Sequence, residues 1–202
     1  MTKSVAVTIP TMGASHLVDT LSSIPGGTPL YLRDNRSDNW GVAKSWNWGI
    51  KKALADGAEY VLVLNDDVRL DVPDFIDRLI ADLHREGVIL AGGRPDHIEP
   101  KPDDTRLAMS AFMCDARLFR ELGEFDEIFW PAYFEDADML HRIQISGTWR
   151  TYFDSDALFH HWVSSTRNEL RGVRWTVRLH YKTNRERFFQ KWGFYPDASN
   201  KK

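Results

Sequence analysis

The sequence predicts an α/β fold in which a mainly parallel sheet is flanked by helices and followed by a C-terminal amphipathic helix. Over residues 4–93, short apolar runs alternate with segments whose apolar residues recur at helical spacing, an order that favours parallel strands joined by helices. The chain has 202 residues, 43% of them hydrophobic, which is enough for one sizeable core. We therefore expect a single domain over residues 1–202.

The elements of the first half follow from local patterns. Apolar runs bounded by turn-forming residues predict strands at residues 4–10, 29–35, 58–64 and 88–93. Helical spacing of apolar residues predicts helices within residues 14–24, 41–57 and 72–87. The third strand is apolar without alternation, as expected for a strand that is covered on both faces. Ligands on such sheets bind at the carboxyl ends of the strands.

The second half is less regular. Residues 95–104 are rich in proline and acidic residues, which predicts a loop. After this loop we expect a strand leading into a helix, a second helix, a pair of short strands and a long terminal helix, within residues 105–123, 135–147, 148–165 and 168–193.

Composition excludes several classes of protein. The net charge of −3 argues against a protein whose whole surface coats nucleic acid. The single cysteine, Cys114, excludes an internal disulfide framework and a cysteine-based zinc site. No stretch approaches the roughly 20 apolar residues that span a bilayer, and the N-terminus lacks the pattern of a signal peptide. We expect a soluble, cytoplasmic protein.

The stretch VLVLNDDVRLDVP places Asn65, Asp66 and Asp67 directly after a buried strand, in the region where ligands bind. Two neighbouring carboxylates repel each other unless a cation or several N–H donors neutralise them. Mg²⁺ and Mn²⁺ suit such oxygen ligands, and substrate phosphates often complete their coordination. The alternative is that one aspartate caps the helix near Val72 while the other is solvated.

Four blocks in order carry a resemblance to a known family: RDNRSDNWGVAKSWNWGI, GAEYVLVLNDDVRL, GEFDEIFWPAYFEDADMLHRI and FHHWVSS. Together they resemble the glycosyltransferases of the GT-A fold, in particular the large inverting family 2, over about residues 5–193. The resemblance implies a metal-dependent enzyme that moves a sugar from a nucleotide-sugar, with a UDP-sugar as the expected donor, to a hydroxyl acceptor by single displacement. It also implies a nucleotide-sugar-binding half at residues 1–100 and an acceptor half, with the C-terminal helix, at residues 101–202.

The resemblance assigns donor and metal roles to particular residues. Nucleotide binding is expected from Pro10, Thr11, Asp34, Asn39, Gly41, Asn47 and Asp66. The metal, Mn²⁺ or Mg²⁺, is expected at Asp67, while Asn65 departs from the first aspartate of the family's DxD motif. One of His160 and His161 is expected near the metal or the diphosphate. His160 aligns slightly better, although spacing does not separate the two.

The resemblance also assigns the acceptor side of the site. Asp136 is expected to be the catalytic base, with Glu135 beside it at the acceptor. Trp130, Tyr133 and Ser110 are expected to shape the acceptor pocket. The alternative for the acidic pair is an ordinary helix start, where negative charges favour the helix dipole.

The terminal helix carries a basic stripe that owes nothing to the resemblance: Arg167, Arg171, Arg174, Arg178, Lys182 and Arg185. Its simplest interpretation is the solvated edge of an amphipathic helix. The sharper interpretations are an anionic partner such as DNA, an acidic membrane surface or an acidic protein subunit.

The sequence does not distinguish among four classes of acceptor for a transferase: a glycan, a protein, a metabolite or a hydroxylated DNA base. A rival function of another class is a non-catalytic module that binds nucleotide or nucleic acid. A nucleotidyltransferase ranks lower, because TMGASHLVDT after the first strand has one glycine and no lysine or arginine.

Overall fold

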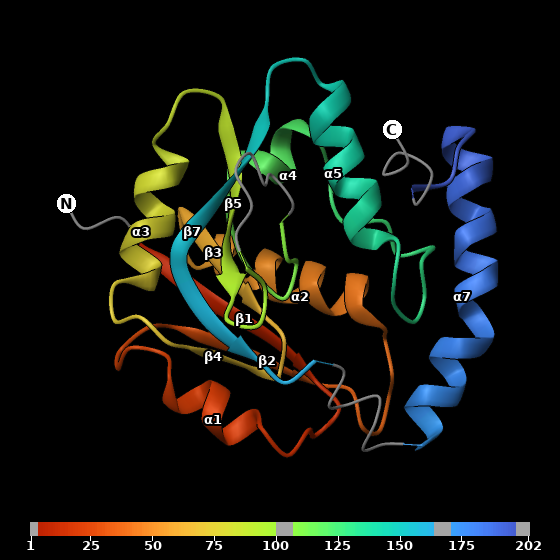
Figure 1. The fold of residues 1–202 in the computed structure, drawn as a ribbon, viewed down its shortest axis with the longest axis horizontal. Helices are drawn as coiled ribbons and strands as arrows, with labels where there is room; N and C mark the ends of the chain where they lie inside the picture. Colours follow the sequence, from red (N-terminus) through yellow and green to blue (C-terminus); the bar gives the residue numbers. More distant parts are fainter. Residues whose placement is uncertain (1–3, 100–106, 164–170, 197–202) are drawn as a thin grey trace.

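The computed structural model describes residues 4–99, 107–163 and 171–196. Figure 1 shows a curled sheet with helices packed around it. The strands are β1 (Val5–Thr11), β2 (Leu30–Asp34), β3 (Tyr60–Leu64), β4 (Val68–Leu70), β5 (Val88–Pro95), β6 (Ala111–Asp115) and β7 (Arg150–His161). The helices are α1 (Leu17–Ser22), α2 (Val42–Ala55), α3 (Phe75–Leu83), α4 (Arg117–Glu121), α5 (Glu135–Ile145) and α7 (Arg171–Trp192).

The predicted fold class is confirmed, but the sheet is mixed. The strand order is β2-β1-β3-β6-β5-β7-β4. β1 pairs in parallel with β2 and β3, and β5 pairs in parallel with β7. β6 runs antiparallel to both of its neighbours, and β4 runs antiparallel to β7. The segment predicted to form a pair of short strands is one long strand, β7, whose pairing with β5 contains register shifts.

The curl of the sheet follows from one short connection. Only Asn65–Asp67 separate β3 from β4, yet β4 lies at the edge of the sheet and pairs with β7. A connection of three residues spans at most about 14 Å between the flanking strand ends. The β7–β4 edge must therefore fold back to the carboxyl end of β3, which brings the end of β7 to the acidic residues.

Both faces of the sheet are covered. All five residues of β3 are buried, as the continuous apolar run predicts. α2 packs through Trp46 and Ile50 on one face, and α3 packs through Phe75 and Leu79 on the other. α2 lies so close to β1 that a Cβ added at Gly49 would be 1.7 Å from the Thr8 hydroxyl oxygen, which explains glycine at that position.

The terminal helix packs on the second half of the fold and away from the sheet. The C-terminal end of α7 reaches α5, where Trp192 donates a hydrogen bond to Asp138 at 2.9 Å, and Phe188 is buried against Phe129 and Phe134. Asn184 is fully buried, and its amide donates to the carbonyls of Trp130 and Ala132 at 3.1 Å each. In the described parts of the chain, no helix combines the length and the apolar character needed to cross a membrane.

Candidate active site

A cavity of about 630 Å³ opens where β1 and β3 end, between the first turn of α5, the end of β7 and the N-terminal part of α7. Eleven of the residues predicted for the site line it: Pro10, Thr11, Asn39, Gly41, Asp66, Asp67, Ser110, Tyr133, Glu135, Asp136 and His161. Residues assigned to the donor, to the metal and to the acceptor therefore share one cavity.

Asp67 and His161 form one wall of this cavity. The Nε2 atom of His161 lies 3.3 Å from Oδ1 of Asp67. The pairing of β4 with β7 causes this contact, because it sets His161 opposite Val68, the residue that follows Asp67. The backbone carbonyl of Asp67 also accepts a hydrogen bond from the N–H of Trp162 at 3.0 Å, which fixes the turn on β7.

The negative charge of Asp66, the neighbour of Asp67, is stabilised by hydrogen-bond donors. Its Oδ2 atom accepts hydrogen bonds from the hydroxyl of Thr11 at 2.7 Å and from the N–H of Met12 at 3.1 Å. Donors from the end of β1 thus stabilise the carboxylate of Asp66, and His161 contacts the carboxylate of Asp67. The alternative of a helix cap is wrong for both aspartates, because Asp74 occupies the N-cap position of α3.

The Asp67–His161 pair can hold a divalent cation, and its carboxylate is the ligand that suits Mn²⁺ or Mg²⁺. A carboxylate and an imidazole from the protein leave most coordination positions for phosphate oxygens and water, as is usual for Mn²⁺ and Mg²⁺. A separate group of Asp71, Asp96 and His160 has its ligand atoms within 4.8 Å of one another, and the two aspartates are exposed. It does not line the cavity, so Asp67 and His161 are the better fit for a cation at the donor.

Glu135 begins α5 and is only 4% exposed. Tyr133 and Phe134 precede it with φ of 72° and 81°, a left-handed conformation that is uncommon for residues other than glycine. This strained turn aims the start of the helix at the cavity. The Oε2 atom of Glu135 is buried and finds no hydrogen-bond partner among the described residues.

The two acidic side chains at this helix start have raised pKa values. Burial raises the pKa of Glu135 well above its usual value, and the negative charge of Asp136 raises it further. Burial also raises the pKa of Asp136, while the backbone N–H groups of residues 134, 136 and 137 partly oppose it. A carboxylate with a raised pKa is a better proton acceptor, which suits a general base.

Four predicted residues do not line the cavity: Asp34, Asn47, Trp130 and His160. Asp34 binds Arg36 through both carboxylate oxygens, and hydrogen bonds from Arg36 hold its pKa at about 2. His160 bonds through Nδ1 to Asp96. The slight preference for His160 over His161 is therefore not supported by the geometry.

Asn47 and Trp130 serve the structure. The amide of Asn47 donates to the carbonyl of Phe125 at 2.8 Å and accepts from its N–H at 3.0 Å, so it joins α2 to that loop. The indole of Trp130 donates to the carbonyl of Asn39 at 3.0 Å. A Cβ at Gly41 would lie 2.7 Å from Trp130, so this glycine makes room for the aromatic ring.

Several lining residues were not predicted: Met12, Asn35, Leu107, Ala108, Met109, Pro131, Ala132, Val163, Thr176 and Val177. Thr176 and Val177 come from the terminal helix. The sequence indicates that Val177 lies on the apolar side of this helix, but which element that side contacts depends on the tertiary fold.

Comparison with known proteins gives a family and a fold. The family model described as "Glycosyl transferase family 2" matches residues 32–140, which is more than half of the chain. The structure resembles the mannosyltransferase PcManGT from Pyrobaculum calidifontis, solved in complex with GDP-Man and Mn²⁺, with a TM-score of 0.58 and 15% identity over 79% of this chain and 56% of that one.

Two further solved structures are similar. TarS from S. aureus has a TM-score of 0.56 and 14% identity over 86% of this chain and 65% of that one. A variant of Drosophila beta1,4-galactosyltransferase 7, in complex with manganese, UDP-Gal and xylobiose, has a TM-score of 0.58 and 13% identity over 83% and 74%. At these identities the likeness shows the fold alone. The chain spans less than two thirds of the mannosyltransferase and of TarS, and no curated protein sequence matches it.

Proposed function

The chain belongs to glycosyl transferase family 2, and from this premise we propose that it transfers a sugar from a nucleotide-sugar to a hydroxyl acceptor with inversion at the anomeric carbon. A UDP-sugar is the donor that we propose first. The observation that carries the proposal is that the Asp67–His161 pair and the acidic start of α5 line one cavity.

On the donor side, Asp67 and His161 would hold Mn²⁺ or Mg²⁺ together with the diphosphate. A divalent cation bound there supplies positive charge that stabilises the departing nucleoside diphosphate. Thr11 and Asp66 support this arrangement, since their 2.7 Å hydrogen bond ties the end of β1 to the turn that carries Asp67.

On the acceptor side, Asp136 takes the proton of the attacking hydroxyl. The acceptor oxygen forms its bond to the anomeric carbon from the face opposite the leaving group, and the bonding pair of the broken bond stays on the departing phosphate oxygen. Burial and the nearby charge of Asp136 raise the pKa of Glu135, which favours its protonated form, and a protonated Glu135 would offer an O–H donor to an acceptor or sugar oxygen.

The donor half of the proposal is tested by thermal shift. We expect one of UDP, GDP, CDP or dTDP to stabilise the wild type in the presence of Mn²⁺ but not Asp67→Ala. Asp77→Ala is the matched control, because Asp77 is exposed on α3 and outside the cavity. Equal stabilisation of all three proteins would contradict the role of Asp67.

The catalytic half is tested by release of nucleoside diphosphate from the donor identified in that way. Asp136→Asn should lose both sugar transfer and the slow hydrolysis of the donor that occurs without acceptor. Its affinity for the donor should stay within about twofold of the wild type. A non-catalytic module would bind the nucleotide-sugar without releasing diphosphate. Unchanged turnover in Asp136→Asn would remove Asp136 as the base.

A further inference from the structure

The outward face of α7 combines apolar and basic side chains. Trp175 is 66% exposed and Leu179 is 55% exposed, and the two lie one helical turn apart. Arg178 and Lys182 are also exposed, and they lie on the same side of the helix as this pair. We call these four residues the α7 outer face.

The charge of this helix differs from that of the whole chain. Residues 171–185 contain five basic residues and no acidic residue, whereas the chain as a whole has a net charge of −3. Arg174 is exposed near the outer face, while Arg185 stacks on Tyr195 at 3.6 Å. Of the predicted stripe, Arg167 and the side chain of Arg171 lie outside what the structure describes. The positive charge is therefore concentrated on α7, and it favours binding of an anionic partner at this helix.

The opposite side of the same helix belongs to the active site. Thr176 and Val177 line the cavity, and Asn184 and Phe188 hold the helix to the rest of the fold. The outer face is thus one helix width from the cavity wall, and a surface that binds it lies close to the site where an acceptor enters.

We propose that the α7 outer face docks on an anionic lipid bilayer, with the helix lying in the plane of the membrane interface. A Trp–Leu pair beside Arg and Lys is the composition that such interfacial helices use, since the apolar side chains enter the acyl boundary and the cations meet the headgroups. A nucleic-acid backbone would use the cations but would leave Trp175 and Leu179 without an apolar environment.

Docking there has a consequence for the acceptor. The bilayer would hold the cavity near its surface, so the acceptor hydroxyl belongs to a molecule that is anchored in or bound to that membrane. This consequence rests on the proposed function, whereas the docking itself does not.

The test is co-sedimentation of the full chain with vesicles, without donor or metal. We expect binding to vesicles of 30% phosphatidylglycerol in phosphatidylcholine and little binding to pure phosphatidylcholine, with a loss of binding between 0.1 and 0.5 M salt. Because each cation near such a surface contributes about fivefold in affinity, Arg178→Gln/Lys182→Gln should bind roughly 30-fold more weakly. Trp175→Ser/Leu179→Ser should lose at least about tenfold.

Matched controls separate this surface from general charge and hydrophobicity. Lys52→Gln/Arg120→Gln removes two exposed cations elsewhere, and Val18→Ser/Ile145→Ser removes two exposed apolar side chains elsewhere. Both should bind anionic vesicles as the wild type does. Equal loss in controls and α7 variants, no preference for anionic vesicles, or binding to duplex DNA in place of vesicles would overturn the proposal.

The outcome is independent of the donor experiments. A protein that binds vesicles but no nucleotide-sugar would keep the docking surface and refute the proposed transfer, whereas the reverse would refute the docking surface alone.

Discussion

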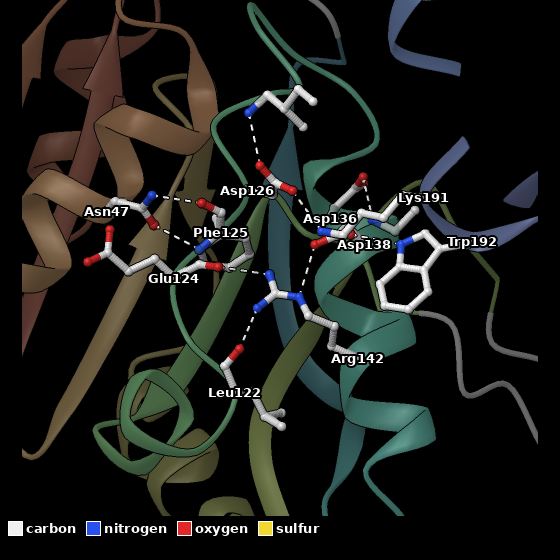
Figure 2. A network of polar contacts seen from close by, with 12 residues as sticks. Asn47, Leu122, Glu124, Phe125, Asp126, Asp136, Asp138, Arg142, Lys191 and Trp192 are labelled. Carbon is white, nitrogen blue, oxygen red and sulfur yellow. Dashed lines mark hydrogen bonds and ion pairs between the residues drawn. The ribbon is translucent and has the colours of Figure 1, made fainter. Parts of the chain in front are cut away.

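Asp138 offers the sharpest test of what holds the acidic start of α5 in place. Its side chain is fully buried. Oδ2 accepts a hydrogen bond from Nε of Arg142 at 2.9 Å, while Oδ1 accepts from Nε1 of Trp192 at 2.9 Å and lies 2.7 Å from Nζ of Lys191 (Figure 2). The carboxylate of Asp138, which lies two residues after Asp136 in α5, therefore joins α5 to the C-terminal end of α7.

Asp138→Asn keeps the volume and removes the charge. Breaking a buried ion pair costs about 3–5 kcal/mol, but both cations here keep other partners. Lys191 retains Asp126 at 2.7 Å, and Arg142 retains the carbonyls of Leu122 and Glu124 at 2.6 and 2.8 Å. Since a hydrogen bond to a charged group contributes about 1.5–3 kcal/mol, and the amide can still accept from an N–H, we expect a loss of roughly 2–4 kcal/mol.

For a chain of this length, that loss lowers Tm by about 4–16 °C, which thermal unfolding followed by circular dichroism measures directly. The control is Asp77→Asn, which also removes a carboxylate from a helix but at an exposed position, and should change Tm by no more than about 3 °C. A loss of Tm in Asp138→Asn no larger than in this control would refute the stabilising role of the Asp138 carboxylate.

Three further predictions concern buried groups. The folded state holds the Glu135 proton above the pH at which the unfolded chain releases it, so wild-type stability should fall as pH rises from the usual glutamate pKa towards the raised one. Glu135→Gln should show a smaller fall in Tm between pH 4 and 8, and the fall that remains includes the contribution of Asp136, whose pKa burial also raises. Parallel curves for the two proteins would contradict the contribution of Glu135. Gly49→Ala forces α2 away from Thr8 and should lower the free energy of unfolding by about 1–3 kcal/mol or more in a urea titration, whereas an unchanged midpoint would show that the helix shifts freely. Cys114 is buried, and burial raises its pKa to about 12, so a thiol reagent should label it only after unfolding, and rapid labelling of the native protein would contradict the structure.

Local patterns predict the elements well where the chain itself decides them. The continuous apolar run before Asn65 predicts a strand covered on both faces, and all five residues of β3 are buried. The same patterns do not predict strand direction, because apolar periodicity is the same for a parallel and an antiparallel strand. The antiparallel course of β6 and the existence of β4, a strand of three residues, depend on tertiary pairing.

Motif spacing has a similar limit within the site. Gly41 and Asn47 match one block of the family pattern, but the pattern does not show their neighbours in the fold: Trp130 packs beside Gly41, which also lines the cavity, and Asn47 holds the loop at Phe125. The sequence shows glycine at this position whether a phosphate or an indole ring packs against it. Only the position of the loop that carries Trp130 distinguishes the two.

The pair of histidines shows most directly what a sequence leaves open. Neighbouring residues of a strand point to opposite faces, so only one of His160 and His161 can face the cavity, and a shift of one residue in the β4–β7 register would exchange them. The register that is found sets His161 opposite Val68 and His160 opposite Arg69. His161 therefore meets Asp67, while His160 meets Asp96 on the other side. The three-residue connection between β3 and β4 anchors Val68 beside Asp67, and pairing across β7 then selects the histidine. The proposed metal ligand at this position is thus chosen by strand register, which residue spacing along the chain does not encode.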